Sequence, residues 1–129
     1  MPAQSRAFQT VDPFGRMWTA EFRWLQNAIS IRHADAVDLK YYLTGEDGQR
    51  EIVLALPNPA LAAVAAKQGR AVTDAWCLGL GSLRLKEMIA SWDDMEKTVV
   101  TVPAADLERL AAALLAGEEA GRERAALHH

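Results

Sequence analysis

The chain has 129 residues, of which 50% are hydrophobic and 24% charged, with a formal net charge of -3. That balance is typical of a single globular domain and excludes wholesale disorder, while the acidic charge gives no electrostatic basis for binding DNA or RNA. The one cysteine excludes an intramolecular disulfide and fits a reducing cytosol. No apolar run approaches the ~18 residues of a membrane span, so we expect a cytoplasmic protein without membrane contacts.

The first half of the chain is predicted to form a sheet. Residues 1–16 lack periodicity, so we expect a loosely ordered arm there. From Met17 to Leu56, apolar and polar residues alternate, which is typical of half-buried β-strands. The strands of this antiparallel meander are predicted at residues 17–25, 28–33, 37–43 and 51–56. The apolar face of the first strand should carry Trp18, Ala20, Phe22 and Trp24.

Turn lengths predict the register of the meander, because opposed residues in an antiparallel pair share a face. A two-residue turn at Gln26-Asn27 places Trp24 opposite Ile29 and joins two apolar faces. A three-residue loop at 34–36 keeps the odd-numbered residues of the next strand on the apolar face. One continuous bent strand through these residues would do the same. The last turn spans residues 45–48. It predicts the pairs Val37–Leu56, Leu39–Leu54, Tyr41–Ile52 and Leu43–Arg50.

Three helices and a fifth strand are predicted after the meander. The helices are expected at residues 58–69, 74–92 and 103–117, and the strand at 98–102. The second helix is apolar on two sides, which places it either at the centre of the fold or against a partner. Its Gly79 and Gly81 each cost ~1 kcal/mol relative to alanine, which suggests that another element approaches closely there.

The predicted fold class is therefore α+β, with the order ββββ-α-α-β-α. A mainly antiparallel sheet should carry three helices on its apolar face. The late strand should join an edge of the sheet or lie beside the first strand. Residues 17–117 are expected to form one domain, followed by a charged tail at 118–129.

Few side chains are candidates for a ligand site. His33 should lie on the core face near Asp35, where it can act as a base or contact a ligand, although a lone histidine is more often structural. Cys77 follows Trp76 near a helix start and can be reactive there, although a free cysteine is more often a buried hydrophobe. These four residues form the predicted ligand-binding set. We predict no catalytic set, cofactor or metal site, because the acidic run at 93–96 lacks the spaced ligands of a calcium loop.

The leading functional hypothesis is a non-catalytic interaction or assembly module that self-associates as a homodimer or binds another protein. It rests on the second apolar stripe of the 74–92 helix, formed by Trp76, Leu80 and Leu83, because exposed apolar clusters mark partner surfaces. These residues fit a core position equally well. The second hypothesis is an enzyme or small-molecule-binding domain with a pocket between sheet and helices near His33. A third is single-stranded nucleic-acid binding, which neighbouring acidic residues disfavour. It would use the polar sheet face of Arg23, Arg32, Lys40 and Tyr42.

Overall fold

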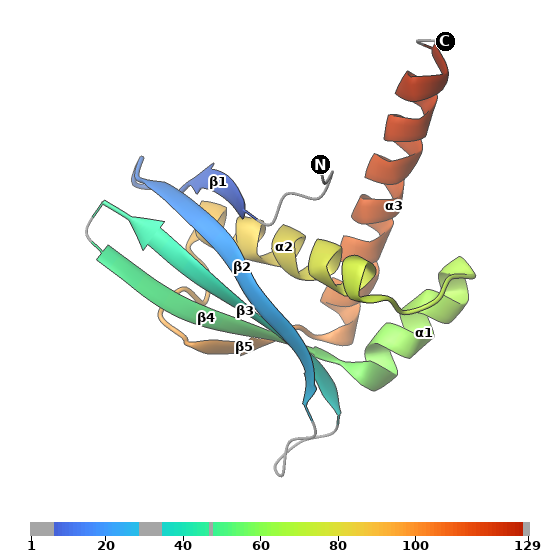
Figure 1. Cartoon of the computed structure of the whole chain (residues 1–129), viewed down its shortest axis with the longest axis horizontal. Coiled ribbons are helices and arrows are strands. Elements are labelled where there is room, and N and C mark those ends of the chain that lie inside the picture. The colour runs from blue at the N-terminus through green and yellow to red at the C-terminus, as the bar shows by residue number, and fades with distance from the viewer. Residues whose placement is uncertain (1–6, 29–34, 47, 128–129) are drawn as a thin grey trace.

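The computed structural model describes residues 7–28, 35–46 and 48–127 (Figure 1). The strands are β1 (Ala7–Val11), β2 (Met17–Ala28), β3 (Ala36–Gly45), β4 (Gly48–Pro57) and β5 (Val99–Thr101). The helices are α1 (Asn58–Gln68), α2 (Asp74–Ser91) and α3 (Ala104–Leu127). The strands lie side by side in chain order, antiparallel from β1 to β4, with β5 parallel to β4. The predicted α+β class and the order ββββ-α-α-β-α are confirmed.

The β3–β4 hairpin supplies the centre of the core. Its inward side chains are at most 4% exposed, and they are Val37, Leu39, Tyr41, Leu43, Ile52, Leu54 and Leu56. Gly45 lies opposite Gly48 at the turn, as a two-residue connection requires. The register predicted for this hairpin is confirmed at every pair from Val37 opposite Leu56 to Leu43 opposite Arg50.

The turn predicted at Gln26-Asn27 is wrong, and the loop predicted at 34–36 lies partly outside the described residues. β2 continues through Gln26 and Asn27, where the sequence predicts a turn, and it pairs directly with β3. The strand predicted at 28–33 falls mostly outside the described residues, apart from Ala28, which ends β2. The additional strand is β1, which lies within the predicted arm and pairs with residues 17–21. Only Phe8 and Thr10 of β1 face inward, which is too short an alternation to signal a strand.

A β-bulge in β2 turns Trp24 away from the core. Up to Phe22, the even-numbered residues face inward as predicted. The register then shifts between Phe22 and Trp24, and the extra residue lets Leu25 take the inward position opposite Leu39. Trp24 is therefore on the outer face and 38% exposed, with the Nζ of Lys40 5.7 Å from its ring centroid. The predicted inward Trp24 is wrong because strict alternation carries no signal of a bulge.

A buried carboxylate closes the hairpin between β1 and β2. Asp12 accepts hydrogen bonds from the backbone nitrogens of Phe14 and Arg16, from the Arg16 Nε at 2.7 Å and from the Trp18 Nε1 at 3.0 Å. The Arg16 guanidinium lies 5.2, 5.9 and 5.1 Å from the ring centroids of Phe14, Trp18 and Trp92. Burial alone raises the pKa of Asp12, but these hydrogen bonds outweigh it and lower the pKa to about 2.

Replacing Asp12 with asparagine should destabilise the protein near neutral pH, because the amide group cannot accept every hydrogen bond that the carboxylate accepts. The folded-state pKa of about 2 lies below the ~3.9 of an unfolded chain. The stabilisation is therefore complete above pH ~4 and is lost as the pH falls towards 2. We expect thermal unfolding to give a Tm difference of at least about 4 °C at pH 7, narrowing below pH ~3. A difference independent of pH would contradict this role.

α2 lies between the sheet and α3. A Cβ atom at Gly81 would be 2.2 Å from the Cδ1 of Leu39 and 3.1 Å from the Oη of Tyr41. A Cβ atom at Gly79 would be 3.0 Å from the Cδ2 of Leu114 on α3. The close approach predicted at the two glycines is confirmed, on the sheet side for one and the α3 side for the other. These contacts place α2 at the centre of the fold, one of the two positions that the sequence left open.

The last two elements are β5 and α3. β5 joins the edge that β4 forms, where the nitrogen of Val53 donates to the oxygen of Thr98 at 2.8 Å. α3 packs on α1 and α2, and its second half projects away from the sheet (Figure 1). The helix continues through Gly117, where the sequence predicts its end, and so includes much of the predicted tail. None of the helices described here combines the length and the apolar character needed to cross a lipid bilayer.

Candidate functional site

The four residues predicted to bind a ligand are not gathered at an accessible site in the described part of the chain. His33 lies outside the described residues. Asp35 is exposed, and its backbone oxygen accepts a hydrogen bond of 2.9 Å from the nitrogen of the residue that opens α1. Trp76 and Cys77 are each 2% exposed and belong to the core.

Burial of Cys77 opposes the predicted reactivity of its thiol. Burial, and to a smaller extent the carboxylate of Asp74, raises the pKa of Cys77 to about 11. Because the thiolate is the reactive form, this thiol is protected chemically as well as sterically near neutral pH.

The stripe predicted as a partner surface is mostly buried within the chain itself. Trp76 and Leu80 are 2% and 0% exposed, and Leu83 is half-buried against the same core. The guanidinium of Arg70 lies over the Trp76 ring at 5.2 Å from its centroid. The alternative that these residues are core is therefore correct, and an interaction surface has to be sought elsewhere.

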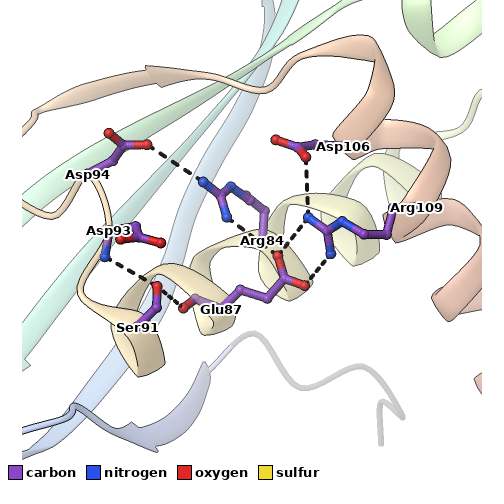
Figure 2. A network of polar contacts seen from close by, with 7 residues as sticks. All are labelled: Arg84, Glu87, Ser91, Asp93, Asp94, Asp106 and Arg109. Atoms are coloured by element: carbon purple, nitrogen blue, oxygen red, sulfur yellow. Dashed lines mark hydrogen bonds and ion pairs between the residues drawn. The ribbon is translucent and has the colours of Figure 1, made fainter.

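A polar network joins α2 to α3 and to the link at 92–98 (Figure 2). Arg109 holds both carboxylate oxygens of Glu87, with its Nη2 3.0 Å from Oε1. Arg84 lies 3.4 Å from Glu87 and 3.6 Å from the carboxylate of Asp94. The hydrogen bonds from Arg109 are the main cause of the lowered pKa of Glu87. The carboxylates of Glu87 and Asp94 each face a cation, and the described residues contain no group of three potential metal ligands, so the network fastens the two helices together.

The outer face of the sheet carries paired charges beside aromatic rings. The guanidinium of Arg23 lies 4.5 Å from the ring centroid of Tyr42 and 2.9 Å from the carboxylate of Glu21. Lys40 is likewise 2.9 Å from a glutamate of β4. The described residues of the predicted nucleic-acid surface do lie together, but their cations already have carboxylate partners. That pairing weakens the attraction for phosphate groups.

Among the described residues, the second half of β2 has no strand along its outer edge. β1 pairs only with residues 17–21, ending with Ala7 opposite Glu21, whereas β2 continues to Ala28 (Figure 1). On the side away from β3, no described strand pairs with residues 24–28, which we call the β2 edge. Backbone groups on such an edge form a template for another strand.

Hydrogen-bond alternation identifies the residues that face this edge. In an antiparallel ladder, pairs that exchange both hydrogen bonds alternate with pairs that exchange none. The nitrogen of Asn58 donates to the oxygen of Asp35, so odd-numbered residues of β3 bond to β4 and even-numbered ones bond to β2. The β2 residues opposite those even-numbered positions are Trp24, Gln26 and Ala28. Leu25 and Asn27 therefore direct their backbone N–H and C=O groups towards the open edge.

A groove of about 420 Å³ lies between β2 and the first turns of α2. It is lined by Phe22, Arg23, Trp24, Leu25, Asp74, Ala75 and Leu78. Five of these seven residues are aromatic or aliphatic, polar atoms share the exposed lining with them, and Arg23 and Asp74 contribute one charge of each sign. The groove can therefore accept apolar side chains next to the open edge, and its two opposite charges do not repel a partner of either charge sign.

Sequence reasoning misses this site because it places a turn at Gln26-Asn27. The run from Met17 to Ala28 contains no glycine, proline or aspartate. Two-residue turns favour Asn-Gly or Asp-Gly pairs, so the absence of glycine was the available signal for one long strand.

Comparisons of this chain with protein-family models, with curated proteins and with solved structures gave no match. The functional argument therefore depends on the open edge and the groove beside it.

Proposed function

We propose that the protein is a non-catalytic interaction module that binds an extended polypeptide strand at the β2 edge. The observation that carries this proposal is the length of β2, which continues to Ala28 although β1 ends opposite Glu21. A strand added there bonds to the backbone groups of Leu25 and Asn27. Main-chain hydrogen bonds provide affinity in this binding mode, and pockets for alternate side chains provide specificity.

The groove defines the side chains that the partner strand should carry. Alternate residues of an added strand point towards the same face of the sheet as Leu25. On that face they meet the wall formed by Phe22 and Leu78. We therefore expect bound strands to carry aliphatic or aromatic residues at alternate positions.

Selection from a random peptide library tests this function. Peptides displayed on phage should be selected on the wild-type protein and then measured against Asn27→Pro, which removes an edge N–H group. We expect at least ~10-fold weaker binding to this variant and unchanged binding to Gln49→Ala, a control at an exposed position of β4 outside the groove. Near-UV circular dichroism establishes that each variant keeps its tryptophan environment. Selected peptides that bind Asn27→Pro as tightly as the wild type would refute the proposal.

Uptake of a small aromatic or apolar ligand is a second candidate function for the same groove. The volume of about 420 Å³ falls within the ~300–1,000 Å³ of typical ligand pockets. A fragment screen separates the two functions. Binding of a small ligand should be lost in Leu78→Trp, whose larger side chain fills the groove. Asn27→Pro should leave the affinity for the small ligand unchanged.

A further inference from the structure

We propose that the strand bound at the β2 edge is the β2 edge of a second copy of this chain. The two edges would run antiparallel about a two-fold axis that passes beside Gln26, and the two sheets would become one continuous sheet. This inference rests on the proposed function and names its partner.

The positions of the outward backbone groups select this register. A two-fold axis at Gln26 places Leu25 of each copy opposite Asn27 of the other. Both residues direct their N–H and C=O groups outward, so each of these two pairs can exchange both hydrogen bonds. An axis at Leu25 would place the other outward residue opposite the bulge at Arg23. The axis at Gln26 therefore gives hydrogen-bond partners to more of the open backbone groups than the axis at Leu25 does.

Charge also favours a second copy. Arg23 is the only charged residue from Phe22 to Ala28, and this stretch has no lysine or proline of the kind that guards edges against self-pairing. In the register proposed, the two Arg23 residues are separated by about 20 Å, at ~3.3 Å per position. That distance exceeds the screening length of ~8 Å at physiological salt. The two Arg23 charges therefore do not oppose this pairing of residues 24–28, and the exposed Trp24 adds apolar surface beside the contact.

The small area of the contact limits the affinity of the dimer. Stable interfaces bury about 800 Å² on each partner, and a strand edge of five residues with one groove offers less. We therefore expect a dissociation constant of roughly 10–100 µM.

Sedimentation equilibrium over ~5–500 µM of the full chain tests the inference. The wild type and Gln49→Ala, a change at an exposed position of β4, should dimerise alike, with a dissociation constant of roughly 10–100 µM. Asn27→Pro should dissociate at least ~10-fold more readily, because proline removes an edge donor and blocks the approach of a strand.

A cysteine at position 26 provides a second readout that does not depend on proline. Opposed residues without mutual hydrogen bonds have Cα atoms about 4.5 Å apart, which suits a disulfide. Gln26→Cys should form a covalent dimer in glutathione buffer. The wild type, with its buried Cys77, and Gln49→Cys, an exposed position on β4, should stay uncrosslinked.

Three results would overturn the inference. The first is a wild-type monomer at ~500 µM, which leaves the peptide-binding function to its own test. The second is a dimer that is insensitive to Asn27→Pro and not trapped by Gln26→Cys, since its interface then lies elsewhere. The third is a monomer in which the Leu25 and Asn27 amides are protected from hydrogen exchange and lose this protection when residues 1–6 are deleted. That result would mean that the chain's own N-terminus occupies the β2 edge.

Discussion

Alanine at Gly81 should destabilise the protein by about 2 kcal/mol or more, although alanine is the better helix former by ~1 kcal/mol. The added Cβ would lie 2.2 Å from the Cδ1 of Leu39 and 3.1 Å from the Oη of Tyr41. Leu39 is 0% exposed and Tyr41 is held by a hydrogen bond of 2.9 Å to Ser82, so neither can move aside without disturbing the core. Urea unfolding measures the loss.

Gly79 provides the matched control. Its Cβ would lie 3.0 Å from the end of the Leu114 side chain, which is half-buried and can turn away. Gly79→Ala should therefore be neutral or slightly stabilising. In a Leu39→Ala background, Gly81→Ala should lower the free energy of unfolding much less than in the wild type. The double-mutant cycle should give a coupling of at least ~1 kcal/mol. Equal effects at the two glycines, or strict additivity in the cycle, would show that α2 is not pressed against β3 at Gly81.

Proline at two adjacent positions of β2 should destabilise the protein to very different extents. The N–H group of Gln26 bonds to β3, so Gln26→Pro removes a ladder hydrogen bond and leaves its acceptor unpaired. We expect a loss of about 3 kcal/mol. The N–H group of Asn27 faces the open edge, where proline is tolerated, so Asn27→Pro should cost less than about 1 kcal/mol.

Urea unfolding of the two proline variants checks the alternation on which the site depends. Asp38 pairs with Gln26, and Asp38→Asn serves as a control for changes on β3 that leave the backbone ladder intact. If Asn27→Pro were the more damaging variant, the outward and inward positions of the β2 edge would be exchanged. The proposed register of a bound strand would then be wrong.

The parts of the fold that the sequence predicts correctly have strong local signals. The β3–β4 hairpin combines uninterrupted alternation with glycines on both sides of a short turn, and its register is right at every predicted pair. The bulge at Arg23 has no such signal, because it inserts one residue into a strand whose composition stays the same. The prediction that Trp24 faces inward therefore fails, while Trp18 and Phe22 pack against the core as expected.

The candidate site depends on contacts between distant segments, which composition and periodicity do not encode. The groove joins Leu25 to Ala75, two residues that are brought together only when α2 crosses the sheet. The two-sided apolar pattern of α2 predicts either a central helix or a partner surface. The choice depends on α3, whose Leu114 covers the helix at Gly79.

Amide hydrogen exchange along β2, resolved by residue in protein diluted to ~1 µM, well below the dissociation constant expected for the dimer, tests the open edge most directly. The account predicts that the amides of Leu25 and Asn27 exchange quickly while those of Trp24 and Gln26, bonded to β3, exchange slowly. In concentrated protein, the Leu25 and Asn27 amides should become protected as a second strand is added. Equal protection of all four amides in dilute protein would contradict an open edge on β2.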